Sequence, residues 1–220
     1  MTEQRTAQEL FQAAYKNRYT WDKSFSGYSA DVQLTQNGEI FNGQAQVNAD
    51  YSTAITGIDN KEASDVVKGQ MWEIAVHRVR RTFEETHSKN TFEYGDTDET
   101  GAVEILIGGK ASGDKYKLRN NEVCMVHRKI HGTIVTIHTS SSHDTGAGYL
   151  SHQYNSVYSD PATGEAKGGK TLFTDLYTQV GDYFILNERT MADAETGDAV
   201  KIQFTNIQML AVKEAAAAAV

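Results

Sequence analysis

The chain runs ADVQLTQNGEIFNGQAQV over residues 30–47, and this stretch decides the fold class. On both sides of Asn37-Gly38 the apolar residues fall on alternate positions, which is the period of a β-strand with one buried face. An Asn-Gly pair between two such runs is typical of the type I′ turn that joins antiparallel strands. The stretch therefore predicts a β-hairpin that buries one face. The residues predicted on that face are Ala30, Val32, Leu34, Phe41, Ala45 and Val47.

The same alternation continues over most of the chain. A second hairpin is predicted to pair residues 122–130 with residues 133–139 across His131-Gly132. A two-residue turn at that point places Met125 opposite His138. Further strands are expected near residues 91–95, 102–108, 115–119, 149–158, 170–180, 183–191 and 199–210. These segments predict about ten strands, mostly antiparallel.

Two segments have helical periodicity instead. A helix over residues 6–18 begins with Thr6 and Glu9, which have the spacing of a capping box. A second helix over residues 59–87 begins at Asp59, and its apolar residues gather on one side at about 100° per residue. That side is predicted to carry Met71, Trp72, Ala75, Val76, Val79 and Phe83.

Together these elements predict an α+β fold. We expect a large curved antiparallel β-sheet, either a half-barrel or a lipocalin-like barrel, packed on the amphipathic helix 59–87, plus the N-terminal helix. One proline and the lack of a Gly/Ser-rich tract leave no linker, so a single β-rich domain over residues 1–220 is expected. Residues 213–220 are expected to be disordered or to form a frayed helical turn.

Composition limits the classes of function. The formal net charge of −8 disfavours nucleic acid, because the chain repels a phosphate backbone. No stretch approaches the roughly 18 apolar residues of a membrane span, and the N-terminus shows no apolar signal segment. The single cysteine, Cys124, cannot form an internal disulfide, which favours a reducing compartment. A cytoplasmic protein is therefore expected.

Motifs that could carry catalysis or bind a metal fail in context. Asp144-Thr145-Gly146 resembles the aspartic protease signature, but polar residues precede it and only one copy is present, so a turn is predicted. His127 and His138 are expected to lie diagonally on one face of the second hairpin, short of the three or four ligands that zinc needs. Neither a metal ion, a cofactor nor a catalytic residue is predicted.

Several residues could instead line a pocket. The second hairpin has a half-polar face, and Asp175 lies between Phe173 and Tyr177 on one face of its strand. A carboxylate between two aromatics is either a polar anchor in a pocket or part of a solvent-facing strand, and we favour the second interpretation. The candidate ligand-binding residues are Trp72, Val76, Phe83, Met125, His127, His138, Phe173, Asp175 and Tyr177.

Four short segments resemble an uncharacterised family of cyanobacterial and chloroplast proteins. They are Arg18-Tyr19-Thr20-Trp21, Phe25-Ser26-Gly27-Tyr28-Ser29-Ala30, Tyr158-Ser159-Asp160 and Phe173-Thr174-Asp175-Leu176-Tyr177. The order of the elements is also similar to the lipoprotein-carrier (LolA-like) half-barrel, in which a curved sheet wraps a helix and encloses an acyl chain. This resemblance implies a carrier of a hydrophobic molecule and transfers no binding residue.

Three classes of function follow from these expectations. The first is non-catalytic binding or carriage of a hydrophobic or amphipathic small molecule, such as a lipid, pigment or isoprenoid. The second is a protein-interaction or assembly factor, which the family resemblance would associate with photosynthetic complexes. The third is a hydrolytic enzyme that uses Asp175 with His127 or His138.

Overall fold

The computed structural model describes residues 5–211, which form three helices and twelve strands. The helices are α1 (Ala7–Lys16), α2 (Lys61–Arg78) and α3 (Phe83–His87). The first six strands are β1 (Gly27–Gln36), β2 (Glu39–Asn48), β3 (Thr53–Thr56), β4 (Asn90–Thr97), β5 (Val103–Gly109) and β6 (Lys115–Arg119). The last six are β7 (Glu122–Ile130), β8 (Thr133–Asp144), β9 (Tyr149–Ser159), β10 (Thr171–Val180), β11 (Tyr183–Asp193) and β12 (Ala199–Met209).

All twelve strands belong to one sheet, in the order β3-β2-β1-β12-β11-β10-β9-β8-β7-β6-β5-β4. The neighbouring strands pair in antiparallel fashion, as in β1 with β2 and β8 with β9. The predicted α+β class, a large antiparallel sheet with an N-terminal and an internal helix, is confirmed. The order ends at β3 and β4 and does not close on itself, so the barrel alternative is wrong for the described strands.

The chain folds into two compact units that interleave in sequence. Unit 1 consists of residues 5–19, Arg81–Asp175 and Thr190–Ala199. Unit 2 consists of Thr20–Arg80, Leu176–Arg189 and residues 200–211. The expectation of one domain over the whole chain stays a prediction, and the expected tail at residues 213–220 lies outside the described residues.

Both predicted hairpins are confirmed. In the first, Gln36 pairs with Glu39, and Asn37 and Gly38 have φ values of 52° and 79°, as a type I′ turn requires. Of the residues predicted on its buried face, only Phe41 is not fully buried. In the second hairpin, Met125 pairs with His138 across a turn at His131-Gly132.

The single helix predicted over residues 59–87 is wrong. α2 ends at Arg78, Val79 is extended with φ −62° and ψ 122°, and α3 begins after Thr82. Thr82 and Glu85 form a capping box, a strong local signal that starts a new helix inside the longer periodic pattern. The N-cap of α2 is Asn60, whose side chain accepts a hydrogen bond from the Ala63 amide at 3.0 Å.

The predicted buried side of this helix is also partly wrong. Trp72 is 61% exposed, whereas its neighbour Met71 is 1% exposed. Around the helix axis, Ile74 and Ala75 lie about 60° and 40° to either side of Met71, whereas Trp72 lies about 100° away and falls outside the buried stripe. The buried side of α2 consists of Ala63, Val67, Met71, Ile74 and Ala75.

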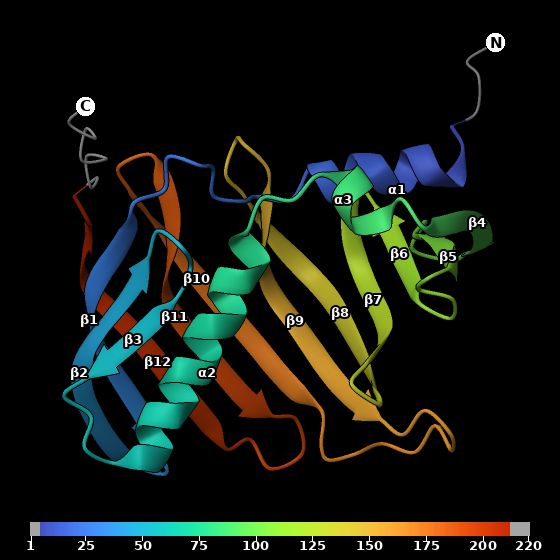
Figure 1. Cartoon of the computed structure of the whole chain (residues 1–220). Helices are drawn as coiled ribbons and strands as arrows, with labels where there is room; N and C mark the ends of the chain where they lie inside the picture. The colour runs from blue at the N-terminus through green and yellow to red at the C-terminus, as the bar shows by residue number, and fades with distance from the viewer. Residues whose placement is uncertain (1–4, 212–220) are drawn as a thin grey trace, which may run out of the picture. The chain divides into compact units, whose positions relative to one another are not determined.

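The core of unit 1 lies between two helices and strands β4–β7 (Figure 1). Phe11 of α1 is 1% exposed and packs against Phe83 of α3 and Tyr116 of β6, with ring centroids 6.1 and 4.7 Å away. His87 at the end of α3 lies in the same cluster, 5.1 Å from the Phe11 ring. α1 and α3 therefore cover one face of β4–β7.

Candidate functional site

The register of unit 1 assigns every side chain of β7–β10 to one of two faces. One row across the strands pairs Val126 with Ile137, Ile137 with Ser156, and Ser156 with Thr171. Val126 packs against the core formed with α1, so this row marks what we call the helix-side face. The neighbouring row, which begins with Met125, lies on the opposite, outer face.

The candidate residues of unit 1 do not gather in one place. Met125, His127 and His138 lie on the outer face, because Met125 pairs with His138 and His127 lies two residues along β7. Phe173 and Asp175 lie on the helix-side face, because Phe173 alternates with Leu172 of the outer row. The structure therefore separates the two histidines from the carboxylate, and their proposed role in one hydrolytic site gains no geometric support.

On the outer face the side chains form ordinary cross-strand contacts. His127 Nδ1 lies 2.9 Å from Thr136 Oγ1, and His138 is exposed. Burial, assisted by Lys117 and Lys170, lowers the pKa of His138 from its usual value. Among residues 5–211, no group of three His, Cys, Asp or Glu side chains could hold a metal ion.

Met125 itself is only 7% exposed, although its face was expected to be the wetter one. Its register partners are His138 of β8 and Lys117 of β6, and the Lys117 side chain is only 28% exposed. The register thus places Lys117 and His138 on either side of Met125. The opposite face, predicted as core, leaves Val135 and Ile137 half-buried.

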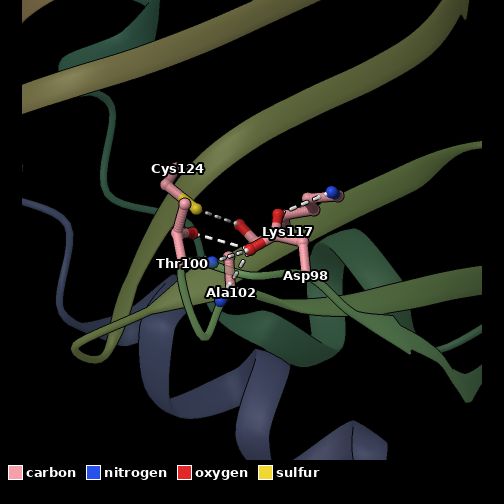
Figure 2. Close-up of polar contacts among 5 residues, drawn as sticks. All are labelled: Asp98, Thr100, Ala102, Lys117 and Cys124. Atoms are coloured by element: carbon pink, nitrogen blue, oxygen red, sulfur yellow. Dashed lines mark hydrogen bonds and ion pairs between the residues drawn. The ribbon is translucent and has the colours of Figure 1, made fainter.

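Beside Met125, Lys117 belongs to a polar cluster that holds a hairpin tip (Figure 2). Asp98 Oδ2 accepts a hydrogen bond from Lys117 Nζ at 2.7 Å, and Asp98 Oδ1 accepts from Thr100 Oγ1 at 2.6 Å and from the Ala102 amide at 3.2 Å. The bond from Lys117 is the largest cause that holds the pKa of Asp98 well below its usual range. Cys124 Sγ donates to the Lys117 carbonyl at 3.3 Å, and burial raises the pKa of the thiol. These contacts fix the turn between β4 and β5.

On the helix-side face, Asp175 is 2% exposed, so the prediction of a solvent-facing strand is wrong at this position. Tyr154 stacks on Phe173 with ring centroids 4.6 Å apart and planes inclined by 4°. The Tyr154 hydroxyl donates to Asp175 Oδ2 at 3.3 Å, and His152 Nδ1 lies 2.8 Å from the Asp175 carbonyl oxygen. The bond from Tyr154 gives the buried carboxylate a partner, and a partner of this kind is what allows a polar group to lie in the interior.

The remaining candidates are structural or lie in unit 2. Phe83 belongs to the core of unit 1, where it is 3% exposed. In unit 2, Val76 is half-buried on α2 and Tyr177 accepts a hydrogen bond from Arg78 Nη2 at 3.3 Å. Trp72 projects from the exposed side of the same helix.

The structure reveals a surface that the sequence did not single out. Beside the part of unit 1 that α1 and α3 cover, the helix-side face of β8–β10 carries mostly apolar and aromatic side chains, which are half-buried except for the buried Ser156 and the exposed Tyr158. We call this surface the strip, and its members are Val135, Ile137, Tyr154, Ser156, Tyr158 and Phe173. The alternation of β9 could have indicated which residues share this face, but no local signal marks Ser156 as buried.

Ser156 is the polar residue at the middle of the strip. It is 4% exposed, and within the described chain its Oγ has no hydrogen-bond partner. Buried hydroxyls are almost always paired, because an unpaired one loses its bonds to water without replacement. The strip thus combines an apolar surface with one unsatisfied hydrogen-bonding group, which is the composition of a site for an amphipathic molecule.

The motifs rejected from the sequence behave as turns. Asp144 closes β8, its Oδ1 accepts a hydrogen bond from the Gly146 amide at 2.8 Å, and Gly146 has φ 76°. The predicted turn is confirmed, and the Asp144 carboxylate accepts a hydrogen bond from the backbone of that turn. The helices of residues 5–211 include none with the length and apolar character that crossing a bilayer requires.

Comparison with solved structures finds distant similarities. The chain is similar to a domain assigned to outer membrane lipoprotein sorting from Vibrio parahaemolyticus, with 10% identity, coverage of 95% of this chain and 94% of that chain, and a TM-score of 0.42. It is also similar to a LolA superfamily protein from Nitrosomonas europaea, with 7% identity, coverage of 94% and 95%, and a TM-score of 0.35. A search of curated proteins finds no match.

One family model covers nearly the whole chain. It matches residues 2–210, which include every strand and helix described above. The chain therefore belongs to the family described as "Protein of unknown function (DUF3386)".

Proposed function

We propose that the protein binds an amphipathic small molecule, such as a lipid, pigment or isoprenoid, on the strip of unit 1. The observation that supports this most is the Ser156 hydroxyl, which is buried and has no partner within residues 5–211. A ligand with an apolar body and a hydrogen-bonding group would satisfy both features of the surface. Binding requires no catalytic group, and the proposal includes none.

The surroundings of Ser156 support the same proposal. Ile137 and Thr171 flank it in the register, and both are half-buried. Further along the face, Tyr158 is 45% exposed. Contact with a ligand would remove this apolar area from water, at roughly 25 cal/mol per Å².

The direct test is to identify what the purified protein carries. Full-length protein would be extracted with organic solvent, and the extract analysed by mass spectrometry beside an extract of a variant. Ile137→Asp places a charge on the strip and should abolish co-purification of the ligand, because a carboxylate must lose its water to lie against an apolar molecule. The matched control is Ile134→Asp, since Ile134 is also half-buried on β8 but lies on the outer face.

The expected result is one amphipathic compound present with the wild type and the control and lost from Ile137→Asp. Extracts without any such compound from all three proteins, together with no uptake of added amphiphiles, would refute the proposal. Equal amounts of the compound in all three extracts would show that it binds elsewhere than on the strip.

Other expectations from the sequence stay predictions. An interaction or assembly role and the association with photosynthetic complexes are not tested by the geometry, and the hydrolytic role gains no support from it, because Asp175 and the two histidines lie on opposite faces. The cytoplasmic location remains a proposal that is motivated by the lone cysteine, Cys124.

A further inference from the structure

We infer that the ligand of the strip has an anionic head group and that Arg128 binds it. This inference rests on the proposed function and adds to it the chemical class of the ligand, a carboxylate- or phosphate-headed amphiphile. The register places Arg128 opposite Val135 and Val135 opposite Tyr158, so Arg128 belongs to the row at one end of the strip. The three residues share the helix-side face.

The hydrogen bonds of Arg128 leave most of its donors unused. Its Nε donates to Asp114 Oδ2 at 2.9 Å, and this is the only hydrogen bond that the side chain forms within residues 5–211. Asp114 Oδ1 is occupied separately by the Lys129 amide at 3.2 Å. The Arg128 side chain is 45% exposed, so the two terminal nitrogens are accessible to a bound anion. A guanidinium presents these donors in a plane that matches a carboxylate or phosphate.

Arg128 also acts on the covered core beside it. Arg128 and Arg18 both act on His87 and Tyr116, whereas Asp114 is the carboxylate that acts on the same two groups. After burial, Arg128 and then Arg18 are the next causes that lower the pKa of His87, to about 4. Arg18 lies over the Tyr15 ring in the part that α1 and α3 cover, so Arg128 is the guanidinium of this pair that belongs to a row of the strip.

The hydrocarbon part of such a ligand would extend from Arg128 along the strip. Two further rows follow on the same face: Ile137 with Ser156, and then Tyr154 with Phe173. From Val135 to Thr139, which pairs with Tyr154 in the last row of the strip, β8 spans roughly 13 Å at about 3.3 Å per residue. The unpaired Ser156 hydroxyl lies on this path, where it would meet a polar atom of the chain or a water molecule that accompanies it.

The test compares ligands that differ only in the head group. Dodecanoate, dodecyl phosphate, 1-dodecanol and acetate would be titrated into full-length protein by calorimetry. We expect the anionic amphiphiles to bind at least about tenfold more tightly than 1-dodecanol, the scale of hydrogen bonds to a charged group. Acetate should not bind measurably, because it lacks the apolar chain. The ratio between dodecanoate and dodecyl phosphate distinguishes a fatty acid from a phospholipid-like ligand.

Variants assign this preference to one residue. Arg128→Gln should make dodecanoate and 1-dodecanol bind equally, and Arg128→Lys should retain part of the preference because it keeps the charge but loses the planar pair of donors. Lys129→Gln removes the same charge from the adjacent, exposed position on the outer face and should change nothing. If Arg128→Gln fails to fold because Asp114 Oδ2 loses its partner, the reduced preference of Arg128→Lys for dodecanoate over 1-dodecanol tests the role of Arg128 by itself.

The outcomes separate this inference from the proposed function. Equal binding of dodecanoate and 1-dodecanol to the wild type would overturn the anionic head group and leave a binding site. An equal loss of preference in Lys129→Gln and Arg128→Gln would overturn the role of Arg128 and indicate the general field of the protein instead. If no amphiphile binds the wild type, the proposed function itself fails.

Discussion

Two neighbouring parts of the helix-side face of unit 1 are built from the same kind of strand, but α1 and α3 cover only one of them. Over β4–β7, α1 and α3 fill the surface, and Phe11 and Ile105 are 1% and 0% exposed. On the strip, Ile137 is only half-buried, and the Ser156 hydroxyl has no partner within residues 5–211. The alternation of a strand predicts that a face will be covered, but it does not say whether side chains of the protein or a ligand will cover it.

The largest expected difference concerns stability. Phe11→Ala should lower the free energy of unfolding by about 3–5 kcal/mol, because it leaves a cavity among packed rings. Ile137→Ala should cost only about 1 kcal/mol, since its side chain is not fully enclosed. Urea denaturation of both variants measures the two values. Equal losses would show that the strip is ordinary core.

A second expected difference is the response of the covered part to acid. Burial, followed by Arg128 and Arg18, lowers the pKa of His87 from 6.5 to about 4, against the opposing effect of Asp114. The folded state therefore favours neutral His87, and this contribution is complete above pH 6.5 and is lost as the pH falls towards 4. The loss amounts to about 3 kcal/mol over this interval. Urea denaturation at a series of pH values would measure it.

The matched variant is His87→Leu, which keeps an apolar side chain beside Phe11 and cannot be protonated. Its stability should fall less than that of the wild type between pH 6.5 and 4. Carboxylates that titrate near pH 4 affect both proteins alike, so the difference between the two curves isolates the histidine. Parallel curves would mean that His87 is accessible to water in the folded protein.

A smaller expected effect is a gain in stability on the strip, opposite in sign to the loss expected from Phe11→Ala in the covered part. Ser156→Ala should raise the stability of the ligand-free protein by about 1 kcal/mol, because it removes a buried hydroxyl that lacks a partner. The control is Ser140→Ala, since Ser140 Oγ donates to the Gln153 carbonyl at 3.1 Å and its removal should be neutral or slightly destabilising. A loss of stability in Ser156→Ala would mean that an internal water already satisfies the hydroxyl.

The elements that could be predicted from the sequence are those with local causes. Asn37-Gly38 and His131-Gly132 fixed two hairpins and their registers, because their positive φ values specify the turn. The helix over residues 59–87 could not be delimited, since Thr82 starts a new helix within one continuous periodic pattern. Trp72 was assigned to the wrong side because the predicted side included both Met71 and Trp72, whereas the buried stripe is centred nearer Ile74, which the prediction left out.

The candidate site was less predictable, because burial depends on which elements pack together. The acidic side chain of Asp175 indicates water, yet hydrogen bonds such as that from Tyr154 allow it to be buried. No sequence pattern singles out Ser156 or Arg128, which are 28 positions apart and share a face only through the pairing of β7, β8 and β9. Phe83 was a pocket candidate and became core once α3 had formed.

The smallest expected effect lies on the outer face, at the hairpin tip before β5. The hydrogen bond from Lys117 lowers the pKa of Asp98, so the ionised carboxylate stabilises the folded state above the ordinary pKa of 3.8. That stability is lost as the pH falls below this value. Asp98→Asn should remove this acid-dependent part of the unfolding curve and lower the melting temperature slightly at pH 7.

The control for this effect is Asp96→Asn, which removes the same charge from an exposed position nearby and leaves the bond between Asp98 and Lys117 intact. Thermal melts between pH 2 and pH 7 would compare the two variants. Because Asp98 also accepts from Thr100 and the Ala102 amide, asparagine can replace only part of its contacts. If both variants lose the same acid dependence, the general repulsion of a chain with net charge −8 governs this tip, and the ion pair contributes nothing of its own.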